Sequence, residues 1–120
     1  MLQVGALNLA GVTHLFVVPR IRTSQYIRML SDAFPELRYS SPGNIQESAL
    51  PLLRNLVVVD NIHDAAELQR ETRDVKSITN WREIFIWRED TSEQRHVEEL
   101  TLSQRSDEVI NLQFTRWVFL

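Results

Sequence analysis

Histidine and carboxylate side chains are the residues of this chain whose types and spacing could bind a metal ion. His63 and Glu67 are four residues apart, and His96 and Glu99 are three apart, so each pair would share one face of a helix. Neither pair has a third ligand at a suitable spacing, and the two-histidine helix motif of zinc proteases is absent. We therefore expect these histidines, together with His14, to be ordinary surface residues and no metal to bind.

Arginines gather around a tyrosine in the segment PRIRTSQYIR. The arginines are Arg20, Arg22 and Arg28, and an aromatic residue among them is typical of a phosphate or nucleic-acid patch. The alternative is a loop between a strand and a helix whose charges are solvated. Thirteen Lys and Arg residues against 16 Asp and Glu give a net charge of −3, without the basic surplus of most nucleic-acid binders. We expect the solvated loop and no nucleic-acid partner.

Motifs for nucleophilic catalysis and phosphate binding are absent from the 120 residues. The glycines, Gly5, Gly11 and Gly43, are far apart, so no loop can hold a phosphate through consecutive backbone N–H groups. Ser92 and His96 are close in sequence, but no triad pattern surrounds them. The chain has no cysteine, which excludes disulfides, thiol nucleophiles and cysteine-based zinc sites. The residues alone indicate no catalytic constellation.

Apolar periodicity predicts alternating helices and strands. The expected strands are residues 13–19, 53–61 and 107–115. The expected helices are residues 2–10, 22–37, 77–89 and 91–104. Residues 38–51 are expected to be a loop, and residues 62–76 either a short helix or a mobile loop. This order favours an α/β fold with a parallel sheet and flanking helices, and three strands are few enough to suggest part of a larger sheet.

Local signals set the expected ends and faces of these elements. Gly11 ends the first helix, and Pro35 ends the second. The residues expected to cap the later helices are Thr23 or Ser24, Ser77 or Thr79, and Thr91 or Ser92. The side chains expected to face a core are Ile27, Leu30, Phe34, Trp81, Ile84, Phe85, Val97 and Leu100. The run at 13–19 is apolar at successive positions, which is typical of a strand covered on both faces.

The composition indicates a folded chain that could form a core. Hydrophobic residues make up 43% of the chain and charged residues 24%, which argues against disorder. No stretch approaches the roughly 18 apolar residues of a membrane-spanning helix. The N-terminal apolar run lacks a basic start and is interrupted, so we expect no secretory signal.

Two segments resemble one enzyme family. Residues 10–61, which include AGVTHLFVVPR and ALPLLRNLVVVDN, resemble the middle of the N-terminal domain of AMP-forming acyl-CoA synthetases, the adenylate-forming ligases, of the fatty-acid type. The family phrase R-T-S-x-Y-x-x-M-L is matched by Arg22, Thr23, Ser24, Tyr26, Met29 and Leu30. SDEVINLQFT, at residues 106–115, is similar to the strand that runs into the family's phosphate-binding loop. The resemblance is weakest between residues 62 and 105.

The resemblance implies a domain assignment and a set of cofactors. Residues 1–115 would be a fragment of the AMP-binding N-terminal domain, and residues 116–120 a tail that does not match. The family continues after Thr115 with a Ser/Thr/Gly-rich loop that ends in lysine, whereas this sequence continues RWVFL. Thr115 is therefore expected to be the vestigial start of the ATP-binding loop. The full-length family uses ATP, magnesium and coenzyme A, and we expect no cofactor for this chain.

The resemblance also implies a reaction. The family activates a carboxylic acid, here a fatty or polyketide-like acid, through an acyl-adenylate, in lipid metabolism or, in fungi, secondary metabolism. This chain by itself is expected to be inactive. The alternatives are a non-catalytic fragment that self-associates or pairs with a full-length ligase through exposed sheet edges, and a pseudogene product. Localisation is expected to be intracellular, cytoplasmic or peroxisomal, although the final VFL does not resemble the peroxisomal tripeptide.

Overall fold

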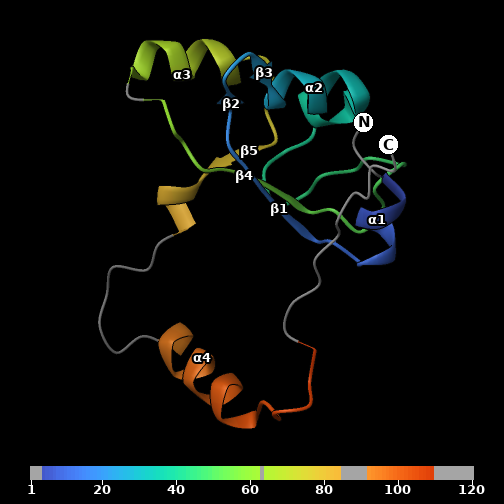
Figure 1. The fold of residues 1–120 in the computed structure, drawn as a ribbon, viewed down its shortest axis with the longest axis vertical. Helices are drawn as coiled ribbons and strands as arrows, with labels where there is room; N and C mark the ends of the chain where they lie inside the picture. Colours follow the sequence, from blue (N-terminus) through green and yellow to red (C-terminus); the bar gives the residue numbers. More distant parts are fainter. Residues whose placement is uncertain (1–3, 63, 85–91, 110–120) are drawn as a thin grey trace, which may run out of the picture. The chain divides into compact units, whose positions relative to one another are not determined.

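The computed structural model of the protein describes residues 4–62, 64–84 and 92–109. Contacts divide the chain into two units, Met1–Phe85 and Ile86–Leu120. The second unit contains helix α4 (Ser92–Ser103) (Figure 1). The elements of the first unit are, in chain order, α1 (Val4–Leu9), β1 (His14–Val17), β2 (Arg20–Ile21), β3 (Ser24–Gln25), α2 (Tyr26–Ala33), the 3-10 helix η1 (Pro35–Arg38), β4 (Asn55–Val58), α3 (Ala65–Thr72), β5 (Ile78–Asn80) and the 3-10 helix η2 (Trp81–Ile84).

A three-stranded parallel sheet organises the first unit. Its strand order is β1-β4-β5, with His14 opposite Asn55 in one pair and Leu56 opposite Ile78 in the other. Parallel neighbours need crossover connections, and α2 and α3 lie in these two connections. Figure 1 shows both helices on the same side of the strands. The expected α/β class with a parallel sheet and flanking helices is therefore confirmed.

One hydrophobic core joins the sheet to its helices. The buried residues of this core are Ile27, Leu30, Phe34, Leu37, Ile45, Leu50, Leu53, Leu56, Val58 and Val75. Partly buried residues from α1, the turn after it, β1, α3 and β5 pack against them: Val4, Leu7, Val12, Leu15, Val17, Leu68 and Ile78. Burying one such aliphatic side chain contributes roughly 1.5–3 kcal/mol. The helices are thus held mainly by this shared core.

The expected ends of α1 and α2 are confirmed. Gly11 has φ +65, a left-handed conformation that glycine adopts without strain, and the N–H of Val12 donates to the carbonyl of Leu7 at 3.1 Å. α2 stops at Ala33, and Pro35 begins η1. Proline lacks the N–H that a continuing helix would need, so the chain changes helix type there.

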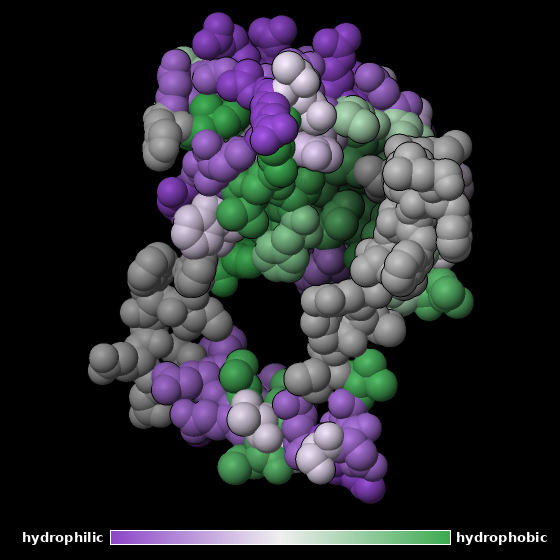
Figure 2. Space-filling view, viewed as in Figure 1, coloured by the Kyte–Doolittle hydropathy of each residue, from purple (hydrophilic) through white to green (hydrophobic). Residues whose placement is uncertain are grey.

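The burial of strand β1 differs from the prediction. The run at 13–19 is not covered on both faces, because the β1 residues alternate between exposed and half-buried and Phe16 is 55% exposed. Among the described residues β1 is an end strand of the sheet, whereas the central strand β4 buries Leu56, Val57 and Val58. Phe16 and Val57 are register partners on the side away from the core. Figure 2 shows hydrophobic residues gathered over the strands.

The start of α2 was predicted wrongly. Thr23 and Ser24 do not cap a helix: β2 and β3 pair as a short antiparallel hairpin, and Ser24 lies in its second strand. The N-cap residue is Gln25, whose side chain makes no capping hydrogen bond. The hydroxyl pattern was ambiguous, because serine and threonine favour turns as well as helix caps.

The prediction of a helix at residues 77–89 is also wrong over residues 77–80, although residues 81–84 do form the 3-10 helix η2. Thr79 lies in β5 opposite Val57, and Ser77 is buried with its hydroxyl donating to the Leu37 carbonyl at 2.7 Å. The open edge of β4 accepts this β-branched segment as a third strand, and that pairing overrides the helical spacing of the aromatic residues. Residues 85–89, with Phe85 and Trp87, lie outside the described residues.

The predictions for three further segments, residues 38–51, 62–76 and 91–104, are confirmed in part. The loop after η1 contains no helix or strand, but Ile45 and Leu50 pack into the core from it. Of the two alternatives for residues 62–76, the helix is confirmed as α3. α4 is confirmed as a helix from Ser92, and Thr91 lies outside the described residues.

The end of the described chain differs from expectation. Val97 and Leu100 were expected to face a core but are 60% and 52% exposed. Residues 107–109 are not in a strand, and the rest of the strand predicted at 107–115 lies outside the described residues. Thr115 and the tail at 116–120 also lie outside them. In the described ranges, no helix has both the length and the apolar composition to cross a bilayer.

Candidate functional site

The candidate site lies at the carboxyl edge of the parallel sheet. Because parallel strands end at the same edge, the residues that follow them meet there, and open α/β sheets bind ligands outside this edge. Polar residues follow each strand: Arg20 after β1, Asp60 and Asn61 after β4, and Asn80 at the end of β5. The sheet thereby collects polar groups from three distant parts of the sequence.

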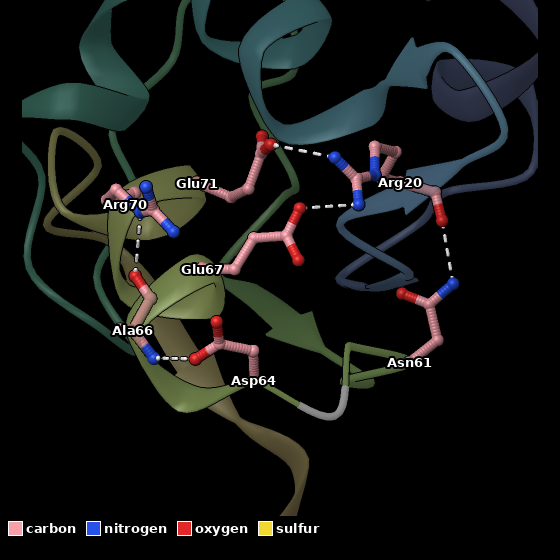
Figure 3. Close-up of polar contacts among 7 residues, drawn as sticks. All are labelled: Arg20, Asn61, Asp64, Ala66, Glu67, Arg70 and Glu71. Carbon is pink, nitrogen blue, oxygen red and sulfur yellow. Dashed lines mark hydrogen bonds and ion pairs between the residues drawn. The ribbon is translucent and has the colours of Figure 1, made fainter.

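Arg20 is the central cation of this edge. Its guanidinium contacts the Glu67 carboxylate at 2.6 Å and the Glu71 carboxylate at 3.8 Å, both from α3 (Figure 3). The Asn61 side-chain amide donates to the backbone carbonyl of Arg20 at 2.6 Å. The side chain of Glu71 is only 12% exposed, whereas that of Glu67 is 33% exposed. The contacts tie the β2–β3 hairpin to α3.

Asp64 fixes the start of α3 beside this cluster. Its carboxylate accepts a hydrogen bond from the backbone N–H of Ala66 at 2.9 Å, which satisfies one of the free donors of the first turn (Figure 3). The guanidinium of Arg70 donates to the Ala66 carbonyl at 3.2 Å. The capped turn holds Glu67 and Glu71, which are one helical turn apart, toward Arg20.

A second ionic group joins β4 to the segment after β5. Arg82 pairs with Asp60, whose side chain is 15% exposed, and its backbone N–H donates to the Asn80 side chain at 2.9 Å. The same guanidinium lies 4.8 Å from the ring centroid of Trp81, within the range of a cation–π interaction. These contacts hold the carboxyl ends of two neighbouring strands together.

A cavity of about 510 Å³ opens between the hairpin and the start of α3. Its lining residues are Arg20, Arg22, Asn61, Ile62, Asp64 and Glu67. The described lining residues include two arginines and two carboxylates, so their charges balance, and Arg20 is already engaged by Glu67. A polyphosphate needs a surplus of positive charge or a row of backbone N–H donors. The cavity is therefore suited to a small neutral or zwitterionic polar group rather than to a nucleotide triphosphate.

Arg22 is the one described non-glycine residue with a positive φ, +53. It occupies the turn between β2 and β3, and a left-handed conformation costs roughly 1–2 kcal/mol for a residue with a Cβ. The register of the hairpin imposes this conformation, since Ile21 pairs with Ser24 and leaves only two residues for the turn. The arginine segment is thus a hairpin that leads into α2 rather than the expected loop of solvated charges, and Arg20 is paired with carboxylates of α3.

Of the two histidine–carboxylate pairs suggested by the sequence, the structure describes both members of one, His96 and Glu99 in α4. His14 and His96 are exposed, and the His14 ring lies 2.9 Å from the Thr13 hydroxyl. Glu67 faces Arg20, and its sequence partner His63 lies outside the described residues. Within the described ranges, no three His, Cys, Asp or Glu residues are grouped so as to hold a metal ion. Thr115 cannot be placed relative to this site, because it lies outside those ranges.

Sequence reasoning missed most of the residues at the carboxyl edge. Asp60 and Asn61 were used only as the end of a strand, and Glu71 and Arg82 were not singled out. A signal was present, because polar residues directly after a buried apolar strand tend to lie at the carboxyl edge of a sheet. The partners of Asp60 and Arg20 could not be found in this way, since they come from elements that are distant in sequence.

Comparison with known proteins found no match. No protein-family model matches the chain, and neither the curated proteins nor the solved structures contain a match.

Proposed function

We propose that this chain is part of an ATP-dependent acid–CoA ligase that activates a fatty or polyketide-like acid through an acyl-adenylate. In this proposal the 120 residues supply structure to the nucleotide-binding domain, and they do not carry out adenylation by themselves. The proposal rests on the resemblance of residues 10–61 and 106–115 to the adenylate-forming ligases.

The observation that carries the proposal is the pairing of β1 with β4. The two segments that resemble consecutive strands of the ligase family are parallel neighbours, in register from His14 opposite Asn55 to Val17 opposite Val58. The phrase from Arg22 to Leu30 lies in the crossover between them, as the hairpin turn, β3 and the first part of α2. The parallel pairing of these two segments, with the phrase in the connection between them, supports the proposal.

Two features support the absence of adenylation by these residues alone. Phosphate chemistry needs donors and cations positioned around the nucleotide, and the 120 residues contain no glycine-rich loop to supply them. At the carboxyl edge of the sheet, Arg20 is engaged by Glu67 and Arg82 by Asp60. Neither guanidinium could bind a phosphate without leaving a carboxylate unpaired.

The first experiment is to sequence the transcript and the genomic DNA across the codon for Thr115. We expect another reading frame or a downstream exon to encode a phrase like S-G-T-T-G followed by P-K. The protein that includes this phrase should catalyse ATP–pyrophosphate exchange with medium- or long-chain fatty acids, whereas the purified 120-residue chain should give only the background rate.

Two results would count against this proposal, each against a different part. If no frame encodes such a phrase, the ligase assignment fails. If the purified 120-residue chain catalyses acid-dependent exchange above background, the assignment of a purely structural role fails.

A second candidate function is non-catalytic binding through the sheet. It is favoured by the position of β1, which among the described residues pairs only with β4, and by the 55% exposure of Phe16. End strands with free backbone groups and apolar side chains readily add a strand from another chain. In this candidate, β1 associates with a second copy of the chain or with a full-length ligase.

Light scattering coupled to size-exclusion chromatography over a wide range of concentrations tests this second candidate. The average mass of the wild-type chain should rise with concentration, and Phe16→Ser should remain monomeric. Met29→Ser is the matched control, because Met29 is 47% exposed on α2 and does not belong to the sheet. A wild-type chain that stays monomeric at every concentration, or a control that behaves like Phe16→Ser, would exclude self-association through β1.

A further inference from the structure

We draw no further inference here: the strongest candidate, the buried Glu47 carboxylate beside the cavity of about 350 Å³ lined by residues between 44 and 54, carries none because its one oxygen without a hydrogen-bond partner among the described residues has less than 1 Å² of accessible surface, so a molecule in that cavity could not reach it.

Discussion

Helices α2 and α4 have similar apolar spacing in the sequence but different burial in the structure. α2 places Ile27 and Leu30 in the core, and Phe34 joins them directly after its end, each at 2% exposure or less. α4 has no buried residue, and its apolar side chains Val97 and Leu100 are more than half exposed. Periodicity therefore predicts that a segment can form a helix, whereas burial requires a complementary surface. Isolated helices of this length are marginal in water, so α2 gains most of its stability from the sheet.

The largest loss in the free energy of unfolding should come from truncating a core leucine of α2. Leu30→Ala removes a side chain that is 2% exposed and should lower the free energy of unfolding by about 3 kcal/mol, because the lost burial is accompanied by a cavity. Urea unfolding followed by circular dichroism measures this change. Leu52→Ala, at a position that is 48% exposed, is the control and should change stability much less.

A smaller effect is expected from the hydrogen bond that fastens the segment after α2 to β5. Ser77→Ala removes the buried hydroxyl that donates to the Leu37 carbonyl at 2.7 Å. The loss should be about 1 kcal/mol, because the backbone N–H of Ser77 still donates to the same carbonyl at 3.3 Å. The midpoint of thermal unfolding should fall accordingly, and Ser48→Ala, at an exposed position, should leave it unchanged.

For α3 we expect an effect on stability between those for α2 and α4. This helix has no fully buried residue, but its first turn has a side-chain cap. Asp64→Ala should cost about 1 kcal/mol by leaving the Ala66 N–H without its acceptor. Asp64→Asn keeps an acceptor oxygen and should restore most of the stability. Equal unfolding midpoints for wild type, Asp64→Ala and Asp64→Asn would show that the cap does not stabilise α3.

The smallest effect is expected in α4. Leu100→Ala changes a side chain that is 52% exposed and should alter the free energy of unfolding by less than about 0.5 kcal/mol. The same urea series used for Leu30→Ala gives a direct comparison of two leucines in two helices. A loss comparable to that of Leu30→Ala would mean that the apolar side of α4 is covered in solution and that the contrast between the helices is wrong.

Some parts of the fold followed from short-range signals. The end of α1 at Gly11, the break before Pro35 and the apolar strand at residues 56–58 were all predictable, because each depends on the backbone chemistry or hydrophobicity of neighbouring residues. β5 and the β2–β3 hairpin were not predictable in the same way. β5 forms because the edge of β4 accepts it as a neighbour, and the hairpin forms because Arg22 adopts the left-handed conformation of a two-residue turn. In both segments strand pairing overrides local helix preference.

The sequence by itself determined that the chain has enough apolar residues for one core and that helices end at Gly11 and before Pro35. It also determined that no phosphate-binding loop lies within these 120 residues. The tertiary structure alone decided that Arg20 meets Glu67 and Glu71, and that Asp60 meets Arg82. It also decided which apolar positions are buried. The reason is physical: local signals act through neighbouring backbone atoms, whereas ion pairs and burial depend on residues that only the folded sheet brings together.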